Sequence, residues 1–293
     1  MKLEIFRQMT YISPSSFRVW ELCQYKTFLT KLAGHPFMKS PAGPPAKIGT
    51  AFDSYVKDHI AKKKNIKSPV LTLHSMLYDV EEEFRNIGWE LAKKYISNPL
   101  IGMFLDTVDL KLEQEMYANV SGVPLLGRID AIINSDPFDW KVRGFGKSKA
   151  YPTKGYDKKF VYNGEKWYEM PVPMFDTTLE DSQPDWAIQK LFYCWILGRP
   201  ARPYHIHELI NRGDELELYV HQGNISREFA SKVMVRVKRM WQSITDQFYY
   251  AEIDKPFPVT RRCEKYNVLC EAAHVCKFYK ETLGDAERRA TYL

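Results

Sequence analysis

Two short apolar runs, residues 123–133 and 137–142, constrain the fold most strongly, because each carries charge in its middle. Asp130 lies in the first run, and Asp139 and Lys141 lie in the second. Side chains alternate along a strand, so Asp139 and Lys141 project from one face, and pairing of the runs would bring Asp130 beside them. Charges inside apolar strands are costly unless they have partners. Two carboxylates that bind a hard divalent cation, next to an ammonium that orients water, are suited to phosphodiester hydrolysis.

The same residues have a second interpretation, because an acid followed two residues later by a lysine is common on half-exposed strands. The neighbours weigh against it. Phe138 and Trp140 flank Asp139, and the apolar residues 131–133 follow Asp130. A partner such as a metal ion is therefore favoured over a solvated strand face.

These residues resemble the motifs of the PD-(D/E)xK nuclease superfamily, and most closely those of its RecB-like branch, which includes AddB-type and CRISPR-adaptation nucleases. Residues 127–130 look like the Gly-x-x-Asp strand of that branch, and residues 139–141 look like its Asp-x-Lys strand. Gln189 and Tyr193 match the Gln-x-x-x-Tyr motif that follows. They are four residues apart and share a helix face. By resemblance this face contacts the substrate strand or the attacking water, although Tyr193 alone would pass for a core residue.

Two earlier segments fit the same family in the right order. Residues 13–26 look like its N-terminal helix with its cysteine, here Cys23. Residues 49–53 look like the Gly-x-x-x-His segment, with Asp53 in place of the histidine. A carboxylate suits magnesium and manganese, so Asp53 is a competent ligand. The alternative is that Asp53 faces solvent on a helix of about residues 50–61.

The resemblance implies an α/β fold with a central mixed β-sheet flanked by helices, a restriction-endonuclease-like core. We expect one domain over residues 1–293, with its core at 100–225, a helical N-terminal part at 13–97, and a C-terminal helix and cysteine cluster at 226–293. It further implies that Asp130 and Asp139, with Asp53, bind one or two Mg²⁺ or Mn²⁺ ions. Lys141 would then position the nucleophile.

The cysteines form a second pattern. Cys263, Cys270 and Cys276 lie close together near the C-terminus, whereas Cys194 lies in an apolar helical stretch and is expected in the core. We expect residues 1–10 not to be a secretory signal, and reduced clustered cysteines favour metal binding over disulfides. RecB-like relatives with an iron–sulfur cluster combine one N-terminal cysteine with three C-terminal ones. By resemblance, Cys23 joins the three to hold a [4Fe–4S] cluster that connects the N- and C-terminal segments. A structural zinc site and unrelated buried cysteines are the alternatives.

A basic, glycine-punctuated segment follows the Asp-x-Lys strand. Arg143, Lys147, Lys149 and Tyr151 fall within it. Such a loop beside a metal site can hold a phosphate backbone and stack a base; the alternative is a solvated surface loop. The net charge of +6, from 42 basic and 36 acidic residues, is compatible with nucleic acid but does not require it.

The sequence thus predicts a cytoplasmic, Mg²⁺- or Mn²⁺-dependent deoxyribonuclease, expected to be an exonuclease of DNA repair or recombination. DNA is the expected partner, as single strands or duplex ends, with a homo-oligomer or a helicase as further candidates. No run of 18 apolar residues predicts a membrane span. Two alternatives stay open: a DNA-binding or scaffold subunit with a degenerate nuclease core and an iron–sulfur cluster, and a nuclease that acts on RNA.

Overall fold

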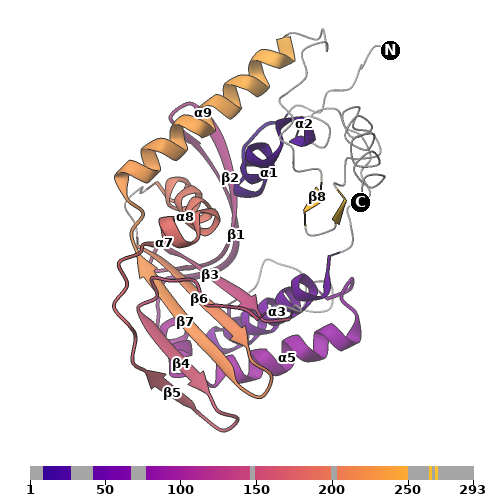
Figure 1. Cartoon of the computed structure of the whole chain (residues 1–293), viewed down its shortest axis with the longest axis vertical. Helices are drawn as coiled ribbons and strands as arrows, with labels where there is room; N and C mark the ends of the chain where they lie inside the picture. Colours follow the sequence, from indigo (N-terminus) through magenta and orange to yellow (C-terminus); the bar gives the residue numbers. More distant parts are fainter. Residues whose placement is uncertain are drawn as a thin grey trace, which may run out of the picture. The chain divides into compact units, whose positions relative to one another are not determined.

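The computed structural model describes residues 9–27, 42–66, 77–145, 149–198 and 203–249, together with two short strands at 264–265 and 268–269 (Figure 1). The chain divides into two compact units. The larger, here called the sheet unit, comprises residues 42–118 and 126–231. The smaller comprises residues 1–41, 119–125 and 232–293.

A seven-stranded sheet with the order β1-β2-β3-β6-β7-β4-β5 is the main feature of the fold. Its strands are β1 (Leu110–Val120), β2 (Val123–Ile133), β3 (Asp136–Arg143), β4 (Lys158–Tyr162), β5 (Trp167–Met170), β6 (Tyr204–Asn211) and β7 (Leu216–Gly223). β3 and β6 run parallel, whereas the pairs β2–β3, β6–β7, β7–β4 and β4–β5 are antiparallel. The sheet is therefore mixed, which confirms the expected α/β fold.

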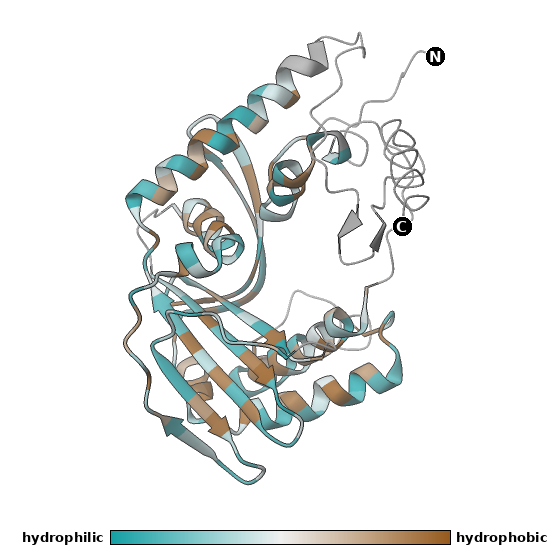
Figure 2. Ribbon diagram, in the orientation of Figure 1, coloured by the Kyte–Doolittle hydropathy of each residue, from teal (hydrophilic) through white to brown (hydrophobic). Residues whose placement is uncertain are grey.

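Helices cover both faces of this sheet. The longer helices of the sheet unit are α3 (Pro44–Lys64), α5 (Glu82–Ile96) and α8 (Pro184–Ile196). Its short helices are α6 (Gly102–Leu105), α7 (Leu179–Ser182) and a 3₁₀ turn, η2 (Pro99–Ile101). Phe138 and Trp140 of β3 pack in the hydrophobic core with α3 and α5. Asp139 and Lys141 alternate with them and contact α8. Hydrophobic and hydrophilic residues alternate along several strands in Figure 2, a pattern typical of strands with one face in the core and the other more open to solvent.

Helix α3 extends further than the predicted range of about 50–61. It begins at Pro44, and Pro44 and Pro45 occupy its first turn, where no backbone N–H is needed. It ends at Lys64, and the next residue, Asn65, caps it in a left-handed conformation (φ 51°). Gly88 of α5 lies against Ala51 of α3: a Cβ atom on Gly88 would lie 2.5 Å from the Ala51 Cβ. This close contact fixes the helix that carries Asp53.

The smaller unit contains α1 (Pro14–Leu22), α2 (Gln24–Thr27), most of α9 (Arg227–Tyr249) and the antiparallel strands β8 (Glu264–Lys265) and β9 (Val268–Leu269). The Ser13 side chain caps α1 by accepting from the Ser16 N–H. Arg236 of α9 donates to Glu21 at 3.0 Å and lies over the Phe17 ring. None of the helices in the described ranges is long and apolar enough to cross a membrane. We also expected a metal cluster to join the two ends of the chain. Three of the four cysteines expected to hold it, Cys263, Cys270 and Cys276, lie outside the described residues.

Candidate active site

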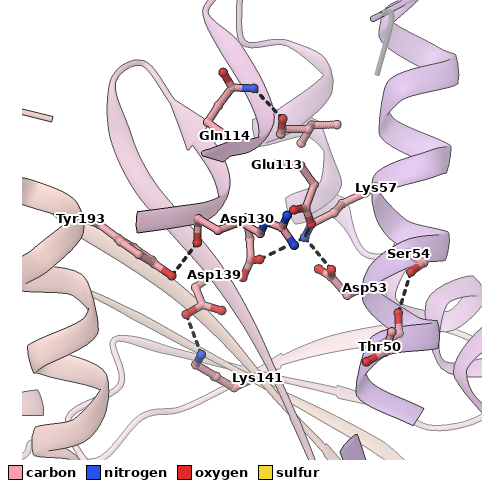
Figure 3. Close-up of polar contacts among 12 residues, drawn as sticks. Thr50, Asp53, Ser54, Lys57, Glu113, Gln114, Asp130, Asp139, Lys141 and Tyr193 are labelled. Atoms are coloured by element: carbon pink, nitrogen blue, oxygen red, sulfur yellow. Dashed lines mark hydrogen bonds and ion pairs between the residues drawn. The ribbon is translucent and has the colours of Figure 1, made fainter. Parts of the chain in front are cut away.

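Helix α3 and the first strands of the sheet bring three carboxylates around one ammonium group (Figure 3). Lys57 Nζ contacts Asp53 Oδ2 at 2.5 Å, Asp130 Oδ1 at 3.1 Å, and Glu113 Oε1. One ligand oxygen from each carboxylate lies within 4.8 Å of the others. Asp53 and Lys57 are one helical turn apart, so both point from α3 toward the sheet. The side chain of Lys57 is only 5% exposed.

Glu113 reaches this cluster through a break in the alternation of β1. Its φ of +50° is in the left-handed region, which costs a residue with a Cβ about 1–2 kcal/mol. Before the break, Leu112 packs in the core of α3 and α5; after it, Met116 packs with Tyr193 of α8. The strand therefore changes face at Glu113, and the carboxylate turns toward Lys57. Such outliers gather at functional sites.

Beside this cluster, on the face of β3 that α8 covers, two lysines flank one buried carboxylate. Asp139 Oδ2 lies 2.7 Å from Lys141 Nζ and 3.1 Å from Lys190 Nζ. Lys141 also donates to Gln189 Oε1 at 2.9 Å. The side chain of Asp139 is 1% exposed and that of Lys190 is fully buried, while Lys141 is 21% exposed. Lys141 is therefore the lysine of the pair that solvent or a substrate can reach.

The predicted helix motif continues this network. Gln189 Nε2 donates to the Tyr193 hydroxyl at 2.8 Å, which donates in turn to the Arg128 carbonyl oxygen of β2 at 2.8 Å. A Cβ on Gly127 would lie 2.8 Å from Ile196 Cδ1 and 3.2 Å from the Tyr193 ring. Glycine at this position thus lets α8 approach β2. A chain of hydrogen bonds therefore runs from Lys141 through Gln189 and Tyr193 to the Arg128 carbonyl oxygen, and it fixes the orientation of Gln189.

The two strand carboxylates have opposite protonation preferences. Burial, and then the charge of Asp139, raise the pKa of Asp130 well above its usual range. Burial would also raise the pKa of Asp139, but Lys141 and Lys190 outweigh it and hold that pKa below its usual range. The surroundings of Asp139 therefore favour its ionised form, whereas those of Asp130 favour its protonated form. Such divergent pKa values are typical of active sites.

The oxygen atoms of this site fit a hard divalent cation. Burial raises the pKa of Asp53 to about 6, against the charge of Lys57. Asp53 Oδ1 is buried and accepts no hydrogen bond from the described residues. Carboxylate oxygens are the ligands that Mg²⁺ and Mn²⁺ prefer. A buried carboxylate oxygen without a donor is a position where such an ion would compensate the charge.

The structure brings together Asp53, Asp130, Asp139, Lys141 and Tyr193 (Figure 3), and Gln189 contacts both Lys141 and Tyr193; all lie within the sheet unit. Of the cysteines, Cys23 and Cys194 lie in the described residues. Cys23 is half-buried at the end of α1, and its Sγ accepts from the Lys26 N–H at 3.4 Å. Cys263, Cys270 and Cys276 lie outside the described residues. Cys194 is buried, in the core where the sequence placed it.

The predicted nucleic-acid contacts begin at the end of β3. Arg143 donates to Glu208 Oε1 at 2.6 Å and to the Tyr151 carbonyl oxygen at 3.0 Å, so it anchors the following loop to the sheet. Tyr151 is 68% exposed, with Lys149 Nζ 6.0 Å from its ring centroid. Lys147 lies outside the described residues.

Sequence reasoning missed three charged residues of the site. Lys57 follows Asp53 by four residues on a predicted helix, a spacing that could have indicated a partner. Lys190 stands among apolar residues in a predicted helix, where a lysine needs a buried anion. Glu113 could not have been identified from the sequence, because alternation along a strand would put it on the same polar face as Lys111 and Glu115. Its positive φ leaves no mark in the sequence, since the residue is not a glycine.

No protein-family model matches this chain, and no curated protein matches it. Its fold is similar to the crystal structure of a protein from Eubacterium rectale described as a "putative exonuclease". The TM-score is 0.52 with 12% sequence identity, over 93% of this chain and 88% of that one. At this identity the likeness shows the fold alone, an α/β fold with a mixed sheet.

Proposed function

We propose that this protein is a metal-dependent nuclease that hydrolyses phosphodiester bonds of DNA, and that it acts as an exonuclease. The observation that carries the proposal is the placement of Lys141 Nζ between Asp139, at 2.7 Å, and Gln189, at 2.9 Å, beside the acidic cluster. The fold likeness to the bacterial structure supports a nuclease core. One site thus contains the Asp-x-Lys residues of β3, the neighbouring Asp130 of β2, and the Gln-x-x-x-Tyr residues of α8.

Each residue has a distinct part in the proposed reaction. Asp130 and Asp139, with Asp53 as a third candidate, would hold Mg²⁺ or Mn²⁺. The ion would lower the pKa of a bound water and stabilise charge on the phosphate. The ammonium of Lys141 has three N–H donors, and Asp139 and Gln189 accept two of them. The third is left to orient the attacking water or a phosphate oxygen.

Substrate binding is proposed for the loop after β3. Arg143 and Glu208 hold the start of this loop, and the exposed side chains of Lys149 and Tyr151 are left for a phosphate and a base. Lys147 is proposed to add a phosphate contact. A helicase or a second copy of this chain is a candidate partner, since either would affect how many nucleotides are removed in one encounter.

An iron–sulfur cluster remains a proposal that rests on the cysteines. Cys23, Cys263, Cys270 and Cys276 would supply the four thiolates that a [4Fe–4S] cluster needs. The backbone N–H of Lys26, 3.4 Å from Cys23 Sγ, would stabilise a thiolate at that position. Zinc on the same thiolates is the competing proposal.

The deciding experiment incubates end-labelled single- and double-stranded DNA with the full chain in Mg²⁺ or Mn²⁺, beside the variants Asp139→Asn and Lys141→Met. Both variants should lose cleavage by at least about a hundredfold, since they remove a charge that acts on the reacting phosphate. Asp136→Asn, three residues earlier on β3, is the matched control and should cleave normally. Full activity in Asp139→Asn would refute the assignment. The length of the first labelled products separates an exonuclease from an endonuclease, and an RNA of equal sequence tests substrate class.

One observation favours a second candidate, a DNA-binding subunit that does not cleave. The ammonium of Lys57 already neutralises part of the cluster formed by Asp53, Glu113 and Asp130. Retained DNA binding by a folded wild-type chain that cleaves none of the substrates would support this alternative.

A further inference from the structure

Carboxylates surround the ammonium of Lys57 in the way that ligands surround a bound metal ion. Its ammonium has three N–H donors, and each faces one carboxylate: Asp53, Glu113 and Asp130. The three carboxylates come from α3, β1 and β2, so elements distant in sequence converge on this single group. All donors of Lys57 are therefore engaged inside the protein.

The position of Lys57 is supported from several sides. Its Nζ lies 5.7 Å from the centroid of the buried Trp140 ring, within range of a cation–π interaction. The close contact between Gly88 and Ala51 holds α3 against α5. The strained φ of Glu113 turns a carboxylate toward the ammonium. A conformation that costs free energy and serves this contact indicates that the lysine belongs in the site.

The lysine contacts leave a specific set of oxygens available. Lys57 takes Oδ1 of Asp130, and Lys141 and Lys190 share Oδ2 of Asp139. The second oxygen of each strand carboxylate is thus outside every ion pair with a lysine of the described chain. In Figure 3 the Asp130 and Asp139 side chains lie next to each other. An ion shared by these two carboxylates would not have to displace Lys57.

We propose that the ammonium of Lys57 permanently occupies one cation position of the site, so that a single divalent ion, held by Asp130 and Asp139, completes it. Four carboxylates face three ammonium groups, which leaves a formal charge of −1 when all are ionised. One divalent ion brings this to +1, whereas two would bring it to +3. The inference rests on the proposed function for the existence of the ion site, and it specifies how many ions that site takes.

The test is a Mn²⁺ titration of the full chain without nucleic acid, followed by calorimetry and by the electron paramagnetic resonance of free Mn²⁺. The wild-type chain should bind one Mn²⁺ in the site. Lys57→Met should bind two, because the carboxylates that faced the ammonium become ligands. Lys63→Met removes an exposed lysine of the same helix and should behave as wild type. Two ions in the wild-type chain, none at all, or one in Lys57→Met would each overturn the proposal.

A second variant covers the case in which Lys57→Met does not fold. Glu113 serves the lysine in our proposal and not the ion, so Glu113→Gln should keep one Mn²⁺ with affinity within about threefold of wild type. Asp130→Asn removes a ligand and should weaken binding by about tenfold or more, as loss of a direct or supporting metal contact does. A tenfold loss in Glu113→Gln would show that Glu113 holds the ion and would refute the role of Lys57.

These measurements separate the inference from the proposed function. A chain that binds one Mn²⁺ with the expected variant pattern, yet cleaves no nucleic acid, would uphold the role of Lys57 and refute the nuclease. A chain that cleaves DNA but binds two ions with Lys57 in place would do the reverse.

Discussion

Replacement of Gly88 by alanine tests whether the packing of α3 against α5 sets the geometry of the site. A Cβ at this position would lie 2.5 Å from the Ala51 Cβ and 2.8 Å from the Phe52 backbone nitrogen. Carbon atoms pack at about 3.5–4.0 Å, so α3 and α5 must separate by about 1 Å. Since α3 carries Asp53 and Lys57, the separation would move both away from the strands.

Two opposing terms give the magnitude. An interior helical Gly→Ala change stabilises by about 0.5–1 kcal/mol. Overpacking costs about 1–3 kcal/mol, and the upper end applies because a backbone atom cannot rotate away. We therefore expect Gly88→Ala to lower the free energy of unfolding by about 2 kcal/mol, and Tm by about 4–8 °C at 2–4 °C per kcal/mol. A shift of about 1 Å should also reduce cleavage by up to about a hundredfold.

Gly49→Ala is the matched control, because Gly49 lies in α3 with no atom within 4 Å of an added Cβ. It should raise Tm slightly through helix propensity alone. Thermal unfolding by circular dichroism and cleavage of end-labelled DNA measure both variants. An increase of Tm in Gly88→Ala equal to that in Gly49→Ala would refute the packing argument. A lower Tm with unchanged cleavage would show that the separation does not reach the site.

Two further predictions concern protons and iron. Burial raises the pKa of Asp53 to about 6 from 3.8, so between these values the folded state binds more protons than the unfolded state. The free energy of unfolding of the metal-free chain should therefore fall as pH rises from about 4 to 6, by on the order of 2–3 kcal/mol from this group. Urea unfolding at several pH values should show a smaller fall in Asp53→Asn, and identical curves would contradict the assignment. Anaerobically purified protein should contain about four iron and four sulfide per chain, with loss of both in Cys23→Ser; one zinc without iron would instead establish the structural zinc site.

Local patterns were sufficient for much of the fold. The apolar run 123–133 became β2 with the same bounds, and the run 137–142 lies within β3. Pro184 begins α8, as its preference for the first helical turn predicts. Each of these elements is specified by neighbours in the sequence, through alternation, helical spacing or the fixed φ of proline. The mixed α/β architecture follows from them and from the resemblance to nuclease motifs.

Element ends were less predictable, because packing extends helices beyond their clearest periodicity. The helix expected at about 50–61 runs over Pro44–Lys64. The single domain expected from the sequence stays a prediction, while the structure divides into two compact units. The cysteine cluster also stays a prediction, because three of its four residues lie outside the described ranges.

The sequence by itself determined which residue types the site would contain: Asp130, Asp139 and Lys141 on strands, and Gln189 with Tyr193 on one helix face. Only the tertiary structure decided their partners. Lys57 meets Glu113 across 56 residues of sequence and Asp130 across 73. No local rule states which distant carboxylates a buried lysine will neutralise. That choice follows from the packing of α3 on the sheet and from a strained strand residue, because burial makes unpaired charges costly and so selects the fold in which they meet.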